Sequence, residues 1–530
     1  MRMPAGRAAQ NASHSIPIPA PVGGWNARDA LINMPEQDAV FLDNFWPTTS
    51  TVELRKGWTE FAALPTDVPA TTPHDIRSLL SYNTPAGTST LFACDQTGIY
   101  NVTAGGAISA ISSVITDGRV QSVNQATAGG NFLWCCNGVD KARYWSGSAW
   151  VVLDGASTPA LTGITSTDVV NVSQFKTRLM LTQKNSLSFW YLPVVSVAGL
   201  AVEFPLGSLF KRGGYLMATT NWTVDGGAGP DDYFVAITSE GEVAVYSGTD
   251  PSNAATWALV GVYFVGKPLC RKCFTKYGGD VAVLTVKGPV LLSKALQSTV
   301  IDRTANLSDK IKNVYRDYVA AGASLYGWET VVFPEAEMLL VNIPVQNNST
   351  YNSTVSYQFV MNTITKAWAR FTNMSAETWV YHAGNLYFAN HNKVNKAWTG
   401  TDDNGAVISA KAKTAYNYLR SRSLTKHVKL LRPNFSATSS VNTQLGLDVD
   451  FSSTGLYSNT SNYARAIALW DTAKWNEAYW SGGSEAVAKW KTVAAKPGRS
   501  FAVRLYLSCK GITMSWNAVD VIAETGQGLL

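Results

Sequence analysis

The sequence has few charged residues. Asp, Glu, Lys and Arg make up 15% of its 530 residues and give a formal net charge of only +6, whereas roughly 25% is usual in soluble domains. Proteins that grip duplex DNA concentrate positive charge in a patch or stripe. The densest basic segment, 419–433, alternates basic and apolar residues, which is typical of a strand edge protected by charge. The composition therefore argues against tight binding of nucleic acid.

Cysteine is scarce as well, and its spacing shows no disulfide framework. Cys270 and Cys273 form a single C-x-x-C without a second pair or a nearby histidine. On a strand, residues three positions apart point to opposite faces, so we do not expect these two thiols to share a metal. The N-terminal residues lack the apolar core of an export signal, and no apolar run approaches the ~20 residues that span a bilayer. We expect synthesis in a reducing cytoplasm and no membrane span.

Recognisable catalytic patterns are missing. Neither G-x-S-x-G nor H-E-x-x-H occurs, and the five histidines are scattered. Glu335 and Glu337 imitate a glycosidase pair, but such carboxylates normally come from different strands, and a Glu-rich turn explains them better. Asp225, Asp231 and Asp232 resemble a calcium loop only loosely, because their spacing does not alternate as EF-hand ligands do. We expect no enzyme, catalytic residue, cofactor or metal, and leave open whether the three aspartates bind a cation.

Aromatic residues, in contrast, are abundant: they form 11% of the chain and include 18 Trp, beside 42 Gly and 21 Pro. Aromatic and β-branched side chains fit half-buried strands, and Gly and Pro fit the turns between strands. Low charge with many aromatics also suits a protein that covers much of its surface with partners. A secreted β-protein with a polar, uncharged surface is the alternative.

A weak pattern recurs from about residue 91 to residue 398: an apolar run, a turn with Gly or Asn, and a second apolar run. One small antiparallel sheet cannot bury both of its faces alone, but sheets stacked in a ring can. Units at a spacing of roughly 40–60 residues therefore predict a β-propeller of about six or seven blades, although a stack of sandwiches gives similar spacing. The turns of these units lie at Gly98, Gly138, Asn185, Gly241, Gly288 and Asn392, with a longer unit before the last.

One of these units contains a segment that mimics a nucleotide-binding loop. Gly261–Pro268 reads G-x-x-x-x-G-K-P. A P-loop needs a glycine-rich backbone that faces phosphate, followed by Lys and a hydroxyl residue. Here Val262–Val265 favour a strand, and Pro268 stands where the hydroxyl residue is required. The segment predicts a strand rather than a nucleotide site.

The predicted fold class is mainly all-β: a β-propeller-like core with a short helical insertion and a C-terminal β-sandwich-like domain. Residues 1–24 are proline-rich and predict an extended arm that either reaches a neighbouring subunit or forms a loose tail. Residues 25–400 form the propeller, with a helical insertion near 308–321 that packs on the rim or reaches towards a partner. Residues 401–530 form the C-terminal domain, and residues 25–75 are candidates to pack against it.

The C-terminal domain also contains a loop that is rich in aromatic residues. Dense aromatic clusters are common at contacts with proteins or sugars, and a packed loop core is equally expected. The loop supports the alternative hypothesis of a carbohydrate-binding β-propeller, that is, a receptor-binding or lectin-like module. Its aromatic residues are Trp470, Trp475, Tyr479, Trp480 and Trp490.

Four long stretches of the sequence, in conserved order along the chain, carry a resemblance to a known family. They are "GGWNARDALINMPEQDAVFLDNFWPTTSTVELRKGW" (23–58), "WTVDGGAGPDDYFVAITSEGEVAVYSGTDPSNAATW" (222–257), "YQFVMNTITKAWARF" (357–371) and "FAVRLYLSCKGITMSWNAVDVIAETG" (501–526). Together they resemble a family of virion proteins of short-tailed bacteriophages and related prophages, namely the tail nozzle or tail tubular proteins of β-propeller type.

The resemblance implies a ring, hexameric in this family, that lies below the portal and adaptor proteins. Such a ring conducts viral double-stranded DNA during ejection without sequence-specific binding, and it offers a docking surface for tail fibres or tailspikes. The missing basic stripe agrees with this role, because each neutralised phosphate would add to binding. The implied location is the virion tail, after synthesis in the cytoplasm of the bacterial host.

We link assembly contacts in such a ring to the first of the four stretches. Arg28, Asp29 and Arg55 serve either ion pairs with a neighbouring chain or turn contacts within their own chain. The predicted assembly contacts are Trp25, Asp29, Phe45, Trp46, Pro47, Arg55 and Trp58.

Overall fold

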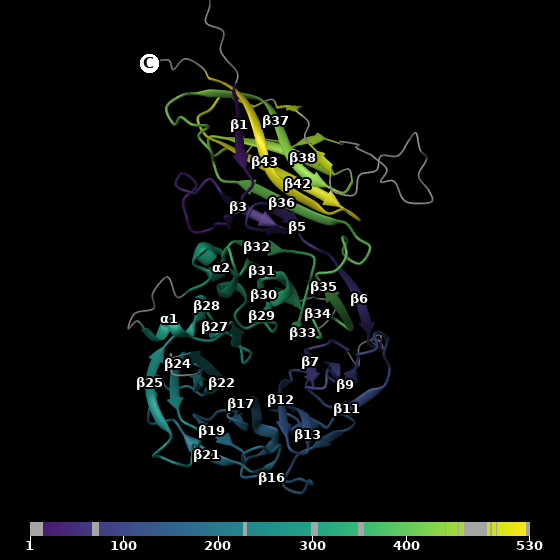
Figure 1. The fold of residues 1–530 in the computed structure, drawn as a ribbon, viewed down its shortest axis with the longest axis vertical. Coiled ribbons are helices and arrows are strands. Elements are labelled where there is room, and N and C mark those ends of the chain that lie inside the picture. Colours follow the sequence, from purple (N-terminus) through teal and green to yellow (C-terminus); the bar gives the residue numbers. More distant parts are fainter. Residues whose placement is uncertain are drawn as a thin grey trace, which may run out of the picture. The chain divides into compact units, whose positions relative to one another are not determined.

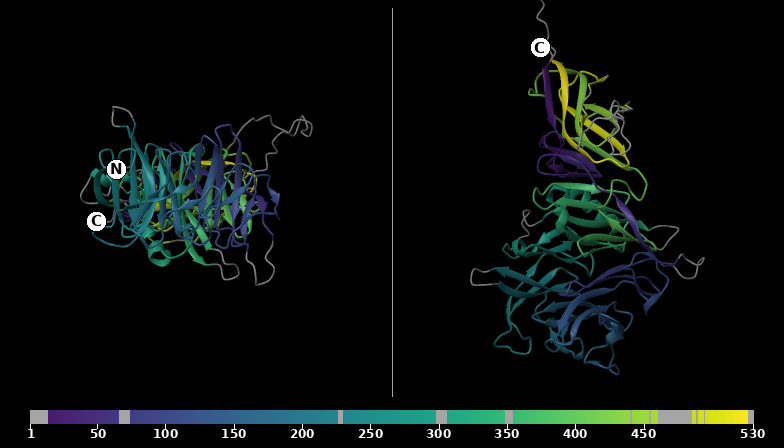
Figure 2. Two further views of the ribbon diagram at one scale, coloured as in Figure 1. Left: turned by 90° about the horizontal axis from the view of Figure 1, so that it is seen from below. Right: turned by 45° about the vertical axis from the view of Figure 1, so that its right-hand side comes forward.

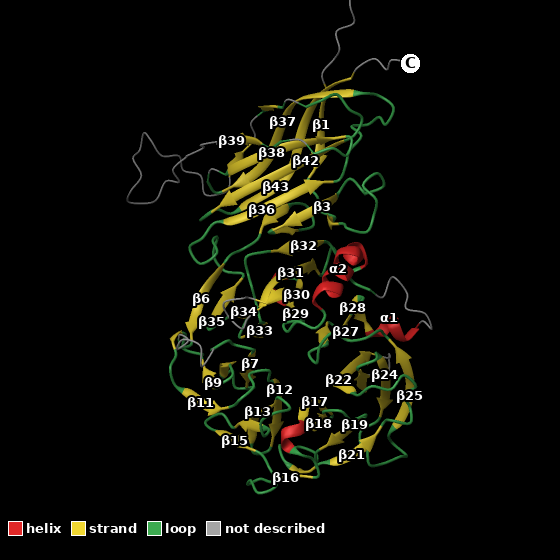
Figure 3. Cartoon of the chain, turned by 180° about the vertical axis from the view of Figure 1, so that it is seen from behind, coloured by secondary structure: helices red, strands yellow, loops and turns green. Residues whose placement is uncertain are grey.

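The computed structural model describes residues 14–65, 74–225, 230–297, 306–347, 354–439, 441–453, 455–459, 485–487, 490–493 and 495–525. Strands make up 53% of the structure and helices 6%, and Figure 3 shows strands in almost every part of the fold. The predicted all-β class with a propeller is confirmed. None of the described helices is long and apolar enough to cross a membrane.

The chain divides into two compact units, each built from segments that are far apart in the sequence. Unit 1 contains Met1–Trp58, Met361–Phe371 and Thr399–Leu530, and unit 2 contains Thr59–Val360 and Thr372–Trp398. The predicted propeller range, 25–400, differs from unit 2 at its start and near residue 365. The reason is strand pairing: β3 (Asp38–Asp43) pairs with β36 (Ile408–Thr414) and with β32 (Trp368–Phe371).

Unit 2 is a β-propeller whose small, mostly antiparallel sheets surround a central axis. Figure 1 shows these sheets arranged around the centre of the unit, each with one edge strand towards the axis. The first two sheets are formed by β7 (Ser78–Asn83), β8 (Ser89–Cys94), β9 (Gly98–Asn101) and β11 (Ile111–Val114), and by β12 (Gln121–Thr127), β13 (Gly130–Cys136), β14 (Arg143–Trp145) and β15 (Trp150–Val152). The next two are formed by β17 (Val169–Phe175), β18 (Arg178–Gln183), β19 (Ser188–Tyr191) and β21 (Val202–Pro205), and by β22 (Leu216–Asp225), β23 (Pro230–Thr238), β24 (Glu242–Ser247) and β25 (Ala258–Phe264).

Three further sheets complete the ring of the described residues. The fifth is formed by β26 (Phe274–Tyr277), β27 (Asp280–Thr285) and β28 (Gly288–Leu291), and the sixth by β29 (Glu329–Phe333), β30 (Met338–Asn347) and β31 (Thr354–Asn362). The seventh contains β33 (Thr378–His382), β34 (Asn385–Asn390) and β35 (Lys393–Ala397). Two further short strands, β16 (Leu161–Thr162) and β20 (Gly199–Leu200), form a parallel pair. In the sequence, β16 precedes the third sheet and β20 lies between β19 and β21.

The seventh sheet closes the ring with strands from the beginning of the unit. Its order is β10-β6-β35-β34-β33, where β6 is Trp58–Ala63 and β10 is Gly106–Ala107. An ion pair of 2.6 Å between Lys393 and Glu60 links β35 to β6. Because early and late segments share this sheet, the ring has no free end.

Aromatic side chains fill the space between neighbouring sheets. Between the third and fourth sheets, the rings of Phe189 and Phe234 lie 4.7 Å apart, and Trp257 stacks on Tyr246 at 5.2 Å. Each fully buried aromatic of this kind contributes roughly 1.5–3 kcal/mol to stability. The propeller is therefore held together by packing between its sheets as well as by pairing within them.

The predicted helical insertion forms a 3₁₀ turn, η3 (Asp309–Ile311), followed by α2 (Lys312–Gly322). Tyr315 of α2 is buried, and its hydroxyl donates a hydrogen bond of 2.9 Å to the carbonyl of Thr285. The helix therefore packs on its own unit. Sequence reasoning missed α1 (Leu292–Gln297) and the 3₁₀ turn η1 (Ser166–Asp168), whereas the 3₁₀ turn η4 (Pro334–Ala336) lies where a Glu-rich turn is predicted.

Unit 1 contains two groups of paired strands. One group joins β4 (Phe45–Pro47), β5 (Val52–Leu54), β43 (Met514–Thr525), β37 (Lys426–Ala437), β40 (Glu485–Val487) and β41 (Lys491–Thr492). In the other, β32, β3, β36, β42 (Phe501–Cys509), β38 (Asn442–Val449) and β39 (Tyr457–Asn459) follow one another, and β2 (Gly24–Trp25) pairs with β3.

The N-terminal segment is extended as far as it is described. β1 (His14–Pro19) pairs antiparallel with β43, from His14 opposite Ala523 to Pro19 opposite Ala518. Figure 2 shows this purple strand beside the yellow C-terminal strand. The described part of the predicted arm is thus a strand of its own chain, while residues 1–13 lie outside the described residues.

Candidate functional site

The first of the four family-like stretches, residues 23–58 (the N-terminal signature), is folded into unit 1 through close backbone contacts. Gly24 has φ +78°, and a Cβ atom there would lie 2.6 Å from the backbone nitrogen of Trp368. Only glycine fits such a left-handed conformation at this distance. Next to it, Trp25 is buried, and its ring lies 5.6 Å from the guanidinium carbon of Arg370.

Arg55 is the most buried charge of the signature. Its side chain is fully buried, and its two terminal nitrogens donate to the two carboxylate oxygens of Asp403 at 2.8 and 2.7 Å. Its Nε donates to Oδ1 of Asn44 at 2.9 Å. A bidentate guanidinium–carboxylate pair fixes orientation as well as charge. Arg55 therefore locks the signature to the segment after residue 399.

The other predicted assembly residues have partners within unit 1 too. Phe45 lies 6.1 Å from Trp516 and Trp46 lies 6.3 Å from Phe371, measured between ring centres. Asp29 accepts hydrogen bonds from Asn26 and Arg28, the carbonyl of Pro47 accepts one from Asn362, and the backbone N–H of Trp58 donates to Asp402. The structure gives all seven residues an intramolecular role, and their part in assembly stays a prediction.

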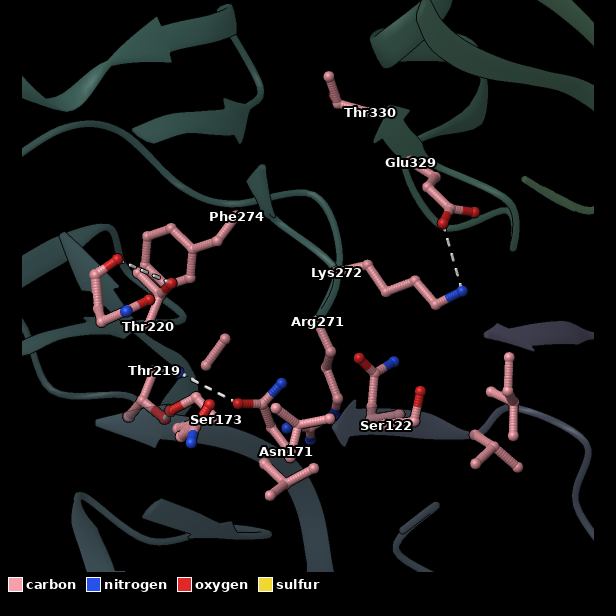
Figure 4. A pocket seen from close by; sticks show the side chains of 18 of the residues that line it. Ser122, Asn171, Ser173, Thr219, Thr220, Arg271, Lys272, Phe274, Glu329 and Thr330 are labelled. Atoms are coloured by element: carbon pink, nitrogen blue, oxygen red, sulfur yellow. Dashed lines mark hydrogen bonds and ion pairs between the residues drawn. The ribbon is translucent and has the colours of Figure 1, made fainter. Parts of the chain in front are cut away.

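A cavity of about 370 Å³ lies on the central axis of unit 2. It is lined by the innermost strands β7, β12, β17, β22 and β29, by β26 and by the turn before β26. Figure 4 shows side chains of this lining from close by. Serine, threonine, asparagine and glutamine side chains dominate the lining, with two cations and one carboxylate. The charged residues are Arg271, Lys272 and Glu329.

Lys272 and Glu329 neutralise each other at this cavity. The Lys272 ammonium lies 3.4 Å from Oε1 of Glu329 and donates to the hydroxyl of Thr378 at 3.1 Å. The second oxygen of Glu329 accepts hydrogen bonds from that hydroxyl and from the N–H of Trp379. Burial lowers the pKa of Lys272, but the charge and hydrogen bond of Glu329, together with Tyr326 and Cys270, raise it by more, so the net pKa is raised. Lys272 is therefore held charged and paired.

Arg271, on the same turn, has weaker partners. Its Nη1 donates to the carbonyl of Met217 at 3.4 Å, and its guanidinium lies 5.6 Å from the ring centre of Tyr215. Among the residues that the structure describes, no carboxylate forms an ion pair with it. Burial lowers the pKa of Arg271. This guanidinium is the uncompensated charge of the cavity.

The C-x-x-C pair lies on this turn, not on a strand. Cys273 is fully buried, Cys270 is partly buried, and both are free thiols. Burial raises the pKa of Cys270 to about 12. The two cysteines flank a bend in the backbone, and this bend directs Arg271 and Lys272 towards the axis.

The carboxylates weighed for catalysis or cation binding lie in a turn or an ion pair where the structure describes them. Glu337 follows the 3₁₀ turn η4 with φ +53°, so the predicted Glu-rich turn is confirmed, and Glu335 accepts a hydrogen bond from Tyr381. Asp232 forms an ion pair of 2.7 Å with Lys176. The side chains of Asp225 and Asp231 lie outside the described residues. No group of three or more metal-ligating side chains occurs in the part of the chain that the structure describes.

Sequence reasoning missed two pairs in which a partly buried histidine contacts a buried carboxylate. His391 is hydrogen-bonded to Asp75, and His74 lies 2.7 Å from Asp95. His74 and Asp75 are neighbours in sequence, but their partners come from different sheets. The paired residues are 21 and 316 positions apart in the sequence, so no local motif predicts these pairs. They fasten the segment before β7 to the first and seventh sheets.

The aromatic loop that supported sugar binding is described only at its end. Trp490 is 37% exposed, and the guanidinium of Arg432 covers its ring at 4.6 Å. One face of this indole is therefore already occupied. The other aromatic residues, Trp470, Trp475, Tyr479 and Trp480, lie outside the described residues.

Of the comparisons with known proteins, only the comparison with solved structures gives matches. No family model matches the sequence, and the curated proteins give no match. A chain in the crystal structure of BBS1N in complex with ARL6DN, soaked with lead, is 14% identical over 48% of this chain and 76% of that chain, with a TM-score of 0.29. YCF48 from Cyanidioschyzon merolae is 10% identical over 64% of this chain and 98% of that chain, with a TM-score of 0.37.

The third structure corrects one expectation. An exo-beta-1,3-galactanase from Phanerochaete chrysosporium, in a crystal structure with galactose, is 9% identical over 88% of this chain and all of that chain, with a TM-score of 0.25. Because an enzyme is among the matches, the prediction that this chain is not an enzyme is contradicted and is withdrawn. A likeness of this size assigns no activity to the chain.

Proposed function

We propose that the chain is a structural protein of a short-tailed phage tail, a nozzle or tail-tube subunit that forms a ring below the portal and adaptor. The proposal is supported by the positions in the fold of the four stretches that resemble tail nozzle proteins. Of the four, three contribute strands to unit 1: β2–β5 from the first, β32 from the third, and β42 and β43 from the last. Most of the resemblance thus falls on one folded unit, while the second stretch, 222–257, lies in unit 2.

Specific contacts join these three stretches. Asp43 of the first accepts two hydrogen bonds, of 2.8 and 2.7 Å, from Arg370 of the third. Val52 and Glu53 of the first pair with Trp516 and Ser515 of the last. Interlocked strands of this kind supply a rigid module, and a ring that resists pressure during DNA ejection requires such a module.

In this proposal the conduit lies between copies of the chain. The axial cavity of unit 2, about 370 Å³, has the size of a small-molecule site. Duplex DNA has a major groove that is alone about 12 Å wide, so the duplex does not fit into this cavity. The low charge of the chain suits a surface that DNA slides past.

The direct test is assembly. Size-exclusion chromatography with light scattering, followed by electron microscopy, is applied to the purified chain alone and with a portal–adaptor assembly. We expect ring particles in the mixture. A chain that stays monomeric and does not bind the assembly contradicts the proposal.

A pair of variants makes the test specific to the predicted contacts. Asp29→Asn alters a carboxylate of the signature that is 25% exposed, whereas Asp317→Asn alters an exposed carboxylate on α2. We expect weaker ring formation for D29N and unchanged assembly for D317N, with circular dichroism to verify that both are folded. Equal behaviour of the two variants removes Asp29 from the interface.

A further inference from the structure

The axial cavity of unit 2 has the composition of a ligand site. Its volume, about 370 Å³, falls in the lower part of the 300–1,000 Å³ range of small-molecule sites. Hydroxyl and amide side chains from several sheets converge on it, and each can donate or accept a hydrogen bond. The hydroxyl residues of the lining that Figure 4 labels are Ser122, Ser173, Thr219, Thr220 and Thr330.

The charge of the lining is unbalanced. Lys272 and Glu329 are paired, but no carboxylate of the described residues forms an ion pair with Arg271. A guanidinium has five N–H donors, and the one side-chain hydrogen bond that Arg271 forms with described residues is a long one, 3.4 Å, to the carbonyl of Met217. A partly buried cation without a counter-charge is costly, and a bound anion removes that cost.

Asn171 supplies a second free donor beside this charge. Its Oδ1 accepts the backbone N–H of Thr219 at 3.2 Å, which fixes the amide so that its NH₂ group is turned away from Thr219. Figure 4 shows this nitrogen on the side of the cavity into which Arg271 extends. No residue of the described chain accepts a hydrogen bond from it. Arginine and amide donors side by side are suited to an oxyanion.

We infer that the axial cavity of unit 2 binds the oxyanion group of a small molecule, a carboxylate or a phosphate, through Arg271 and the amide of Asn171. The hydroxyl side chains of the lining then hydrogen-bond the hydroxyl groups of the ligand. The shared chemistry is an oxyanion on a polar body of about the size of a monosaccharide. This site belongs to one chain and does not depend on the proposed tail function.

The test is calorimetric titration of the full chain at constant ionic strength. The probes are inorganic phosphate, glucuronate and neutral glucose. Binding of phosphate alone identifies a phosphate ligand, binding of glucuronate alone identifies a sugar carboxylate, and either result supports the site. Absence of binding of both anions up to about 10 mM, or glucose binding as tightly as glucuronate, overturns it.

Variants connect the binding to Arg271. Arg271→Gln is expected to weaken anion binding at least tenfold, because charge-assisted hydrogen bonds are lost, whereas Lys287→Gln, at an exposed turn of the same unit, is expected to leave it unchanged. Asn171→Asp keeps the acceptor for Thr219 and adds a negative charge to the cavity, so it is expected to abolish binding even if R271Q does not fold. Unchanged affinity in either cavity variant overturns the assignment. Ring formation with portal and adaptor is a separate readout, so failure of one proposal leaves the other standing.

Discussion

Arg55 and Asp403 are 348 positions apart in the sequence, yet they form a bidentate ion pair with distances of 2.7 and 2.8 Å. Both side chains are buried, at 0% and 4% exposure. Because the partners come from the first and last segments of unit 1, the pair connects the two ends of that unit. A buried pair of this kind is costly to break on one side only, since the remaining charge is left without a partner.

Removal of one partner is therefore expected to destabilise unit 1 strongly. Asp403→Asn should lower the free energy of unfolding by about 3–5 kcal/mol, measured by urea titration. The exposed pair Lys429–Glu524, 3.6 Å apart, is the control: Lys429→Gln should cost about 0–1 kcal/mol. The double variant R55M/D403L should be less destabilised than D403N, because it leaves no buried charge. Equal losses in D403N and K429Q would show that the ion pair contributes little.

The sequence predicts those parts of this fold that depend on neighbouring residues. The hairpin at Gly241 follows from two short apolar runs around a Ser-Glu-Gly turn, and the structure has β23 and β24 there, with φ +84° at the glycine. The strand character of Gly261–Pro268 follows from its β-branched and aromatic residues, and β25 covers its first half.

Other features depend on partners that no local pattern identifies. The assignment of residues 361–371 to unit 1 depends on the pairing of β32 with β3. The ion pair of Arg55 with Asp403 joins residues 348 positions apart, so the sequence does not predict it. The axial cavity takes one or a few residues from each sheet, so its lining has no sequence signature. Cys270 and Cys273 were considered on a strand, and no local pattern in these residues identifies the bend that they flank.

The six cysteines are free thiols, and burial should make them unreactive in the folded protein. Burial raises the pKa of Cys270 to about 12 and that of Cys509 to about 11, and it raises those of the other four as well. At pH 8, a thiol of pKa ~11 is ionised in roughly one molecule in a thousand, and the thiolate is the reactive form. We expect Ellman's reagent to label the native protein at least tenfold more slowly than the same protein in guanidinium, where all six thiols should react. Fast labelling of any one thiol in the native state contradicts this.

The stability of unit 2 should depend on pH through His382. This histidine is 5% exposed and hydrogen-bonded to the hydroxyl of Ser81 at 2.8 Å. Burial lowers the pKa of His382 below its usual value of 6.5. The unfolded chain therefore binds this proton more readily, so stability is lost as the pH falls below 6.5, by at most about 1.4 kcal/mol per pH unit.

The variant His382→Gln should flatten that dependence, because glutamine keeps a hydrogen-bonding group without a charge that titrates in this range. The measurement is the urea midpoint at pH 5, 6 and 7. Tyr381→Phe, on the same strand, is the control and should keep the slope of the parent protein. Identical slopes in H382Q and the parent would show that another group is responsible.

The last strand of the fourth sheet exposes apolar side chains along an edge. Leu259, Val260, Val262 and Phe264 of β25 are 36–48% exposed, and β25 pairs with β24 on one side and ends the sheet on the other. Unpaired strand edges with apolar residues favour pairing between chains, and a single charge opposes it. The fold already uses this device once, since the guanidinium of Arg212 lies 4.0 Å from the ring centre of Phe264.

Val262→Lys should therefore raise the concentration at which the isolated chain self-associates, by severalfold, as measured by light scattering. Val139→Lys is the matched control, because Val139 is 53% exposed on a turn that has no strand edge to pair. The lysine at position 262 points away from the sheet core, so both variants should keep the thermal stability of the parent. If V139K and V262K raise the threshold equally, added charge alone explains the effect and the edge of β25 has no special part in association.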